Sequence, residues 1–429
     1  MIGIVLFIAA LCLLFLGYPI AFTFAGVSLL FGWFALGPDL FAFMPYRIMS
    51  IMENTILMAV PMFIFMGVVL QKSQLAERLL ESMAILFGEI RGGLAISTVI
   101  VGAFLAASTG VVGASVVAMG VISLPVMMKY NYDKRLATGV ICASGTLGQI
   151  IPPSIILIIL GDVMGLPVGD LFKAALWPGI ALILGYILYV TYIAWRHPER
   201  APAIQVAPEK KHKALIQAII YIIPPLLLIV AVLGSIFSGI ATPTESSAFG
   251  GIGAIVLALF SNNFSFKMLL DSAKETSKVS AMVFAVLIGA TAFSMVFTYT
   301  GGDYLVEDFM LQLPGEKWTF IALAMIAILI LGFFIDFVEI AFIIVPILTP
   351  IAESLGINMI WFAILIAMNL QSSFLTPPFG FSLFYLKGVA PDGVATTDIY
   401  KGVIPFIMIQ VAVLAMLIVF PSIFGLSME

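Results

Sequence analysis

SGTLGQIIPPS, from Ser144 to Ser154, and NLQSSFLTPPF, from Asn369 to Phe379, are two apolar stretches that each carry a Pro-Pro pair. The pairs Pro152-Pro153 and Pro377-Pro378 lie 225 positions apart. Proline has no amide hydrogen and interrupts an α-helix, so both stretches are predicted to be broken helices. Broken hydrophobic helices at corresponding positions of two halves are typical of the binding site of a secondary transporter.

Two further landmarks recur at nearly the same spacing. Pro19 and Gly26 correspond to Pro243 and Gly250 at an offset of 224, and the tetrapeptide at 170–173 corresponds to that at 398–401 at an offset of 228. The chain is therefore predicted to consist of two repeats, residues 1–197 and 214–429, joined by a polar linker at 198–213. The linker is rich in lysine and proline.

Composition indicates that most of the surface faces lipid. Hydrophobic residues make up 62% of the chain, charged residues make up 10%, and the mean hydropathy is +1.19. A soluble protein carries about 25% charged residues. The net charge of −4 without a polybasic tail argues against a nucleic-acid partner. We therefore expect a multi-pass membrane protein.

The apolar stretches define the predicted spans. A spanning helix needs about 20 apolar residues. Two long stretches, 93–128 and 318–350, exceed one helix and have small or polar residues near their centres, so each is predicted to be a re-entrant hairpin. Ten spans are predicted, of which 136–165 and 358–386 are the broken helices: 2–16, 18–36, 55–71, 136–165, 172–195, 215–237, 242–260, 280–299, 358–386 and 402–424.

The distribution of basic residues supports this arrangement. With the linker in the cytoplasm, all but three of the 19 basic residues lie on the cytoplasmic side, as the positive-inside rule requires. The exceptions are Arg47, Lys173 and Lys317. Each half then has five spans plus one hairpin, which is an odd number of crossings, so the repeats are inverted. The predicted fold is an all-α polytopic membrane protein built as an inverted repeat.

Asp336 and Glu339 are acidic residues inside the second predicted hairpin. A charge within the membrane is costly and is a functional hypothesis by default. The two carboxylates could line a site for a cation or a polar substrate. Alternatively, they could be structural groups bonded to backbone N–H groups of the hairpin.

The first hairpin tip and the two breaks are rich in oxygen atoms. Ser108, Thr109 and Gly110 occupy the tip, and they could ligate sodium or serve only close helix packing. Each Pro-Pro pair should free carbonyl groups one turn earlier, those of Gly148 and Gln149 in the first break and of Ser373 and Phe374 in the second. Hard cations prefer oxygen ligands, which unwound backbone supplies; a pair of simple proline kinks is the alternative. The polar side chains near the second break are Asn369, Gln371, Ser372, Ser373 and Thr376.

Four stretches together resemble a known family. The stretches are ASTGVVGAS (107–115), SGTLGQIIPPS (144–154), GFFIDFVEIAFIIVPILTPI (332–351) and NLQSSFLTPPFGFSLFYLKG (369–388). They resemble the large membrane subunit of TRAP (tripartite ATP-independent periplasmic) transporters, the DctM type. The resemblance implies an elevator-type ion transporter with transported Na⁺ and no organic cofactor. It also implies a small four-helix membrane subunit of the DctQ type and a periplasmic substrate-binding protein of the DctP type as partners. The expected location is the bacterial cell inner membrane, where the protein imports a small organic acid.

The resemblance also implies site residues. A first sodium site would use Ser108, Thr109, Gly145 and Pro152, and a second would use Gly332, Asn369 and Ser372. We add Gly110 and Thr376 as sodium ligands from their positions at the tip and the break. The residues expected to contact substrate are Thr109, Gln149, Asp336, Glu339 and Gln371.

Three other functions compete with this interpretation. A stand-alone sodium-coupled carboxylate symporter of related two-hairpin architecture would need no partner proteins. A membrane enzyme would need a catalytic cluster at an interface, whereas only isolated charges appear, so we expect no enzymatic activity. A channel would show one continuous polar stripe rather than two polar breaks. The sequence leaves open which organic acid is carried, the sodium stoichiometry and the oligomeric state.

Overall fold

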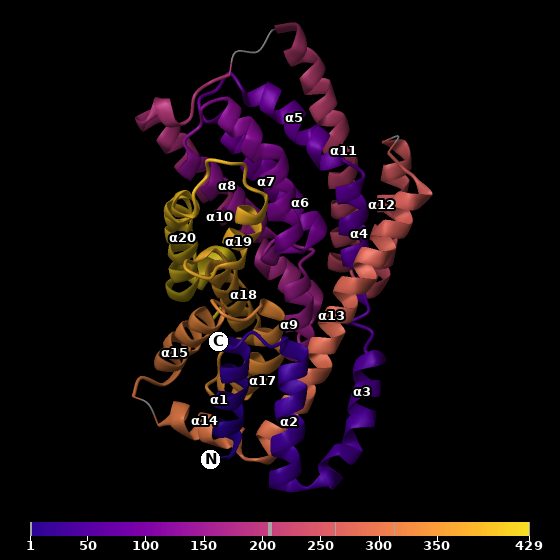
Figure 1. The fold of residues 1–429 in the computed structure, drawn as a ribbon, viewed down its shortest axis with the longest axis vertical. Helices are drawn as coiled ribbons and strands as arrows, with labels where there is room; N and C mark the ends of the chain where they lie inside the picture. Colours follow the sequence, from indigo (N-terminus) through magenta and orange to yellow (C-terminus); the bar gives the residue numbers. More distant parts are fainter. Residues whose placement is uncertain (1, 205–207, 262, 313, 429) are drawn as a thin grey trace.

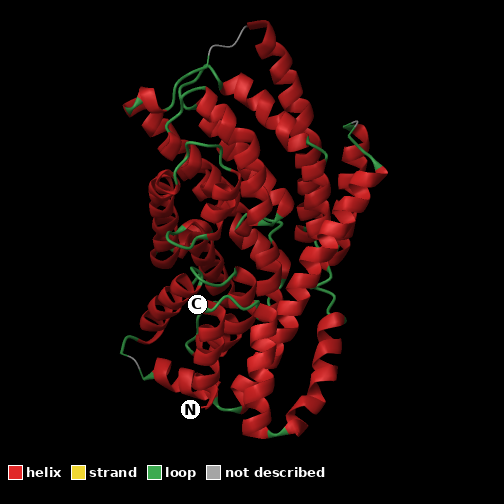
Figure 2. Cartoon of the chain, viewed as in Figure 1, coloured by secondary structure: helices red, strands yellow, loops and turns green. Residues whose placement is uncertain are grey.

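The computed structural model describes residues 2–204, 208–261, 263–312 and 314–428, and over these ranges all regular elements are helical (Figure 2). The first half contains α1 (Ile2–Phe15), α2 (Ile20–Leu36), α3 (Met44–Met52), α4 (Ala59–Lys72), α5 (Leu75–Phe87), α6 (Gly93–Thr109), α7 (Val112–Lys129), α8 (Lys134–Thr146), η2 (Leu147–Gln149), α9 (Ile155–Val163) and α10 (Val168–Arg196). The second half contains α11 (Pro208–Phe237), α12 (Pro243–Phe260), α13 (Phe266–Tyr299), α14 (Gly302–Leu311), α15 (Glu316–Leu331), α16 (Phe337–Glu339), the π-helical turn η4 (Ile340–Ile344), α17 (Val345–Ser354), α18 (Met359–Leu375), α19 (Phe381–Val389) and α20 (Thr396–Val419).

The same order of elements occurs at the end of each half. In the first half a helix pair, α6 and α7, is followed by the interrupted pair α8 and α9 and then by the long helix α10. In the second half α15 and the α16–α17 segment are followed by α18, α19 and α20. The peptide bonds Pro152–Pro153 and Pro377–Pro378 are both cis.

Side-chain caps fix where the two interrupted helices begin. The Asp133 carboxylate accepts hydrogen bonds from the backbone N–H groups of Arg135 and Leu136 at the start of α8. Asn358, 225 positions later, accepts one from the Trp361 N–H at the start of α18. Asp and Asn are preferred N-cap residues because they satisfy N–H groups that lack a partner inside the helix.

The interrupted helices lie in the interior of the molecule. All residues of α8 from Leu136 to Thr146 and of α18 from Trp361 to Leu375 are buried. The helices α4, α11, α12 and α13 lie together along one side of the fold (Figure 1). Outer helices such as α2 and α11 instead expose large apolar side chains, including Phe34 at 85%, as expected for a surface that contacts lipid.

The described residues contain seven helices that are long and apolar enough to cross a bilayer, or eight if α4 and the following 77–87 segment form one span. The sequence predicts ten spans. Five of the seven helices correspond to predicted spans. The other five predicted spans are not counted because α1, α2 and α4 are short and each interrupted helix consists of two shorter helices. The two remaining long helices, Val112–Lys129 and Phe337–Ser354, are the second arms of the predicted hairpins.

Several boundaries also differ from the predictions. The helix α13 begins at Phe266, well before the predicted span 280–299, and α11 begins inside the predicted linker at Pro208. Residues 205–207 of that linker lie outside the described residues. The short helices α3, α5 and α14 were not predicted; α3 and α5 combine apolar and polar faces and are too short to span a bilayer.

Candidate functional site

The tip of the first helix pair is closed by internal hydrogen bonds. Gly110 ends α6 in the left-handed region, with φ of +61°, and its N–H donates to the Ala106 carbonyl. The hydroxyls of Ser108 and Thr109 both lie 2.9 Å from the Leu105 carbonyl. The Thr109 hydroxyl also lies 2.7 Å from that of Ser115 at the start of α7. The predicted tip residues are therefore gathered in one buried turn.

The first break packs directly against this tip. Gly145 of α8 lies against Val116 of α7, and a Cβ atom built at Gly110 would lie 3.1 Å from the Ile155 side chain at the start of α9. Pro152 is buried within the break. The structure thus brings together Ser108, Thr109, Gly110, Gly145 and the Pro152 region.

The second group of predicted sodium ligands is also brought together. Asn369 of α18 donates a hydrogen bond of 2.6 Å to the Met325 carbonyl of α15. A Cβ atom built at Gly332 would lie 2.7 Å from the Cβ of Ser373, so only glycine fits between α15 and α18. The Ser372 hydroxyl donates to the Met368 carbonyl, and the Thr376 hydroxyl donates to the Ser372 carbonyl.

The carbonyl groups near the breaks are less free than the sequence predicts. The Gln149 carbonyl accepts a hydrogen bond of 2.6 Å from the Ser154 hydroxyl, and the Phe374 carbonyl accepts one of 2.8 Å from the Ser382 hydroxyl. The Ser373 carbonyl accepts from the Thr376 N–H at 3.2 Å. The prediction that these three carbonyls are free is therefore wrong, because serines beyond each proline pair turn back to the Gln149 and Phe374 carbonyls and Thr376 closes a turn onto that of Ser373. Each break closes in the same way, with a serine hydroxyl bonded to the carbonyl three residues before the first proline.

The two acidic residues of the second hairpin have different environments. The half-buried Asp336 carboxylate caps α16 by accepting a hydrogen bond of 2.7 Å from the Phe337 N–H. Glu339 is only 4% exposed, and its Oε2 atom has no hydrogen-bond partner among the described residues. Asp336 thus has a structural role in this conformation, whereas Glu339 keeps an acceptor available.

Gln149 and Gln371, which we predicted to contact substrate, are buried, and both atoms of each amide lack a hydrogen-bond partner among the described residues. Gln371 lies close to Tyr186 of α10. The Tyr186 hydroxyl accepts a hydrogen bond of 2.8 Å from Gln410 of α20, and neither residue has exposed surface. Sequence reasoning missed Tyr186 and Gln410. The signal was Gln410, an isolated amide in the apolar run of the last span.

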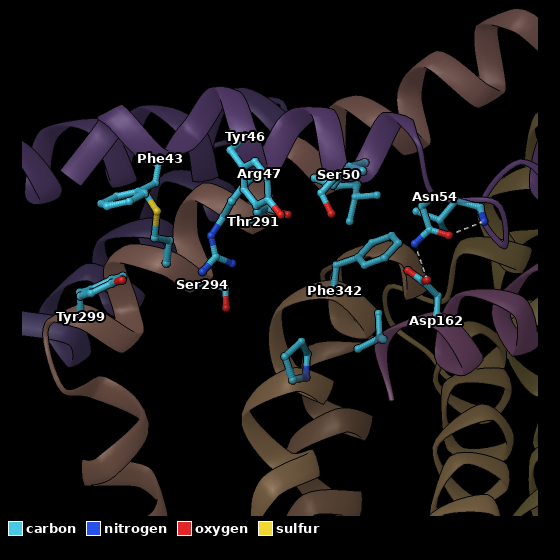
Figure 3. Close-up of a pocket in the computed structure, with 16 residues that line it drawn as sticks. Phe43, Tyr46, Arg47, Ser50, Asn54, Asp162, Thr291, Ser294, Tyr299 and Phe342 are labelled. Atoms are coloured by element: carbon cyan, nitrogen blue, oxygen red, sulfur yellow. Dashed lines mark hydrogen bonds between the residues drawn. The ribbon is translucent and has the colours of Figure 1, made fainter. Parts of the chain in front are cut away.

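A cavity of about 510 Å³ lies between α3, α13, the end of α9 and the second hairpin (Figure 3). Arg47 and Ser50 of α3 and Thr291 and Ser294 of α13 point toward it in the close-up. Asp162, at the end of α9, accepts a hydrogen bond of 2.6 Å from the Asn54 amide. The lining residues are Phe43, Tyr46, Arg47, Ser50, Ile51, Asn54, Leu57, Asp162, Val163, Leu287, Thr291, Ser294, Met295, Tyr299, Phe342 and Pro346.

Several known transporter subunits are similar in sequence to this chain. It is 30% identical over 389 residues to the C4-dicarboxylate TRAP transporter large permease protein DctM of Pseudomonas aeruginosa, covering 90% of this chain and 89% of the relative. It is 29% identical to the ectoine TRAP transporter large permease protein TeaC of Halomonas elongata (96% and 95% covered). It is 27% identical to the sialic acid TRAP transporter large permease protein SiaM of Vibrio cholerae (96% and 94% covered). These relatives are transporter permeases rather than enzymes.

The fold resembles that of the Alcanivorax borkumensis YdaH transporter. The TM-score is 0.60 with 14% sequence identity, and the match covers 91% of this chain and 90% of the other. At this identity the likeness concerns the fold alone. Residues 7–423 match the family model described as tripartite ATP-independent periplasmic transporter, DctM component. The chain therefore belongs to the DctM family of TRAP transporter large membrane subunits.

Proposed function

We propose that this chain is a sodium-coupled permease that imports a small organic acid across the bacterial inner membrane. In this proposal it works with a small four-helix membrane subunit of the DctQ type and a periplasmic binding protein of the DctP type. The names of its relatives include transporters of C4-dicarboxylates, sialic acid and ectoine. All three are small molecules that carry a carboxylate group.

The observation that carries the proposal is the pairing of each helix pair with an interrupted helix. The α6–α7 tip packs on the break between α8 and α9, and the end of α15 packs on α18 just before its break. Each contact buries several hydroxyl or amide groups in the interior of a membrane protein. Buried polar groups at membrane depth are expensive and mark ion or substrate pathways.

The hydroxyls at these contacts suit sodium even though they already form hydrogen bonds. Ser108 and Ser372 each donate their hydroxyl hydrogen to a backbone carbonyl. A hydroxyl that donates keeps its two oxygen lone pairs, so the oxygen is oriented as an acceptor for a cation. Pro152 removes the N–H that would otherwise reach the Gly148 carbonyl. We therefore assign sodium to Ser108, Thr109, Gly145 and Pro152 with the Gly148 carbonyl, and to Gly332, Asn369, Ser372 and Thr376.

In the proposed elevator mechanism, two groups of helices move relative to each other. The moving group is the two helix pairs with the interrupted helices, and the remaining outer helices, including α4 and α11 to α13, form the scaffold. Gly67 of α4 lies against the backbone of Ser108 and Thr109, so at this point the backbones of the two groups are in direct contact. A smooth backbone contact permits sliding, and inverted repeats supply two related positions for the moving group.

Uptake into liposomes tests sodium coupling. The purified chain is reconstituted with the small subunit and the binding protein, and uptake is measured for a panel of carboxylic acids that includes succinate, sialic acid and ectoine. Uptake should rise steeply with external sodium and persist without a pH gradient. Full uptake in sodium-free buffer driven by a proton gradient would exclude the proposal.

A matched pair of serine variants tests the sodium ligands. Ser372→Ala should raise the sodium concentration needed for half-maximal uptake several-fold. Ser28→Ala removes a comparable buried hydroxyl of α2 that also bonds to the carbonyl four residues earlier. It should leave the sodium dependence unchanged. Equal effects of the two substitutions would argue against a ligand role for Ser372.

A further inference from the structure

The cavity between α3 and α13 has the size and composition of a ligand site. Its volume of about 510 Å³ falls within the range of about 300–1,000 Å³ that is usual for small-molecule pockets. Apolar side chains such as Leu287, Met295 and Phe342 form part of the lining, and a few polar groups converge on the same space (Figure 3). None of the residues that we assign to sodium lines this cavity.

One end of the cavity is suited to a carboxylate. The Arg47 side chain points into it toward Ser294, and Arg47 forms no ion pair or hydrogen bond with the described residues (Figure 3). The hydroxyls of Thr291 and Ser294 on α13 also have no hydrogen-bond partner there. Other helical hydroxyls differ in this respect: those of Thr23 and Ser28 bond to the carbonyl four residues earlier, whereas those of Thr276 and Ser280, also on α13, have no partner among the described residues. A free guanidinium with two free hydroxyls forms a donor-rich surface for an anion.

The other end of the cavity carries a carboxylate, that of Asp162, and is therefore rich in hydrogen-bond acceptors. Asn54 is fixed because its side-chain oxygen accepts hydrogen bonds from the N–H groups of Ile56 and Leu57, at 2.9 and 3.2 Å. Its amide nitrogen therefore faces Asp162 and donates to one carboxylate oxygen at 2.6 Å. The second Asp162 oxygen has no hydrogen bond to the described residues. An ionised carboxylate is an acceptor only, so this end attracts a hydrogen-bond donor or a cation and repels a second anion.

From this arrangement we infer that the cavity is a binding site for an organic acid with one carboxylate and, at its other end, a hydroxyl or ammonium group. The carboxylate binds Arg47 with the α13 hydroxyls, and the donor group binds Asp162. This inference rests on the proposed import of organic acids and narrows the substrate class, because an unbranched dicarboxylate would place its second charge against Asp162. The site also joins the proposed scaffold, through α3 and α13, to α9 and the second hairpin of the proposed moving group.

Cysteine labelling tests the anion-binding end without knowledge of the natural substrate. Ser294→Cys is made in a variant in which Cys12 and Cys142 are replaced by Ala, and the purified protein is treated with sulfonatoethyl or trimethylammonioethyl methanethiosulfonate. The measured quantity is the ratio of the reaction rate of the anionic reagent to that of the cationic reagent. This ratio should be several-fold higher for Ser294→Cys than for a free thiol in solution. Arg47→Gln should abolish this preference and Arg47→Lys should retain it. A preference that is absent, or that survives Arg47→Gln, overturns the inference.

Protection from labelling tests the selectivity. Succinate, 4-hydroxybutanoate and 4-aminobutanoate share a four-carbon chain and differ only in the group opposite one carboxylate. At tens of millimolar, the hydroxy or amino acid should slow labelling of Ser294→Cys at least several-fold more than succinate does. Asp162→Asn, which can keep its hydrogen bond from Asn54, should bring succinate to equal protection.

Equal or better protection by succinate with Asp162 intact, or no protection by any of the three acids, overturns the inference. These measurements use no sodium gradient and no partner protein. Their failure therefore leaves sodium-coupled import standing, and a failure of sodium-coupled uptake leaves the labelling result standing.

Discussion

Gly67→Ala is the substitution for which the structure predicts the clearest effect. Gly67 is a buried residue of α4, and a Cβ atom built there would lie 2.5 Å from the Ser108 carbonyl oxygen and closer still to the Cα of Thr109. Favourable separations between non-bonded heavy atoms are about 3.5–4.0 Å. The helix α4 and the tip of the α6–α7 pair would therefore have to separate by on the order of 1 Å.

The size of the effect follows from what must move. The contacted atoms belong to the backbone of a hydrogen-bonded turn, so they cannot rotate away as the end of a flexible side chain could. Overpacking a well-packed interior costs about 1–3 kcal/mol. We expect Gly67→Ala to lower the melting temperature of the purified protein by several degrees and to reduce uptake strongly, because the tip also carries proposed sodium ligands.

Gly234→Ala is the matched control for this experiment. Gly234 lies in α11, and a Cβ atom there would meet no heavy atom within 4 Å. Alanine is favoured over glycine in a helix by up to about 1 kcal/mol, so this variant should melt at or slightly above the wild-type temperature and retain uptake. If Gly67→Ala melts like Gly234→Ala and transports at the wild-type rate, the reasoning about the tip contact is refuted.

Three further predictions concern Asp336, the inverted repeat and the buried Tyr186–Gln410 pair. Asp336→Asn should lose uptake but retain the helix cap and the melting temperature, because asparagine caps a helix about as well as aspartate does. Asp336→Ala should lose both uptake and the cap, at a cost of about 1 kcal/mol of stability. Wild-type uptake by either variant contradicts a role for the charge. Lys173 and Lys401 occupy equivalent, exposed positions near the starts of α10 and α20. In intact cells, an impermeant thiol reagent added outside should label Lys173→Cys but not Lys401→Cys. Labelling of both variants from one side rules out inverted repeats. Tyr186→Phe should destabilise the protein by about 1 kcal/mol because it removes the shorter of the two hydrogen bonds that the buried Gln410 amide donates, to Tyr186 at 2.8 Å and to the Thr146 hydroxyl at 3.5 Å. Thr191→Val on the exposed face of the same helix should change the melting temperature little. Equal melting of the two variants would show that the buried pair contributes nothing.

Much of the helix order could be read from the sequence because membranes impose simple local rules. Apolar length and proline position are local properties, and they predict the helix pairs and both interruptions. The N-cap residues Asp133 and Asn358 lie 225 positions apart, and so do the two proline pairs, because the same local features begin and interrupt the helix in both halves. Residue type also identified the groups that meet at each tip and break, since small and hydroxyl-bearing residues are unusual at the centre of apolar stretches.

What the sequence by itself determined was a helical membrane protein with two matched breaks. What only the tertiary structure decided was how the polar groups are paired. Whether the carbonyls of Gln149 and Phe374 are free depends on Ser154 and Ser382 turning back onto them, which no local rule predicts. The Tyr186–Gln410 pair and the cavity that joins Arg47 to Asp162 each combine residues distant in the chain. Hydrogen bonds and charges act over a few ångströms, so their partners are set by how helices pack and not by the order of residues.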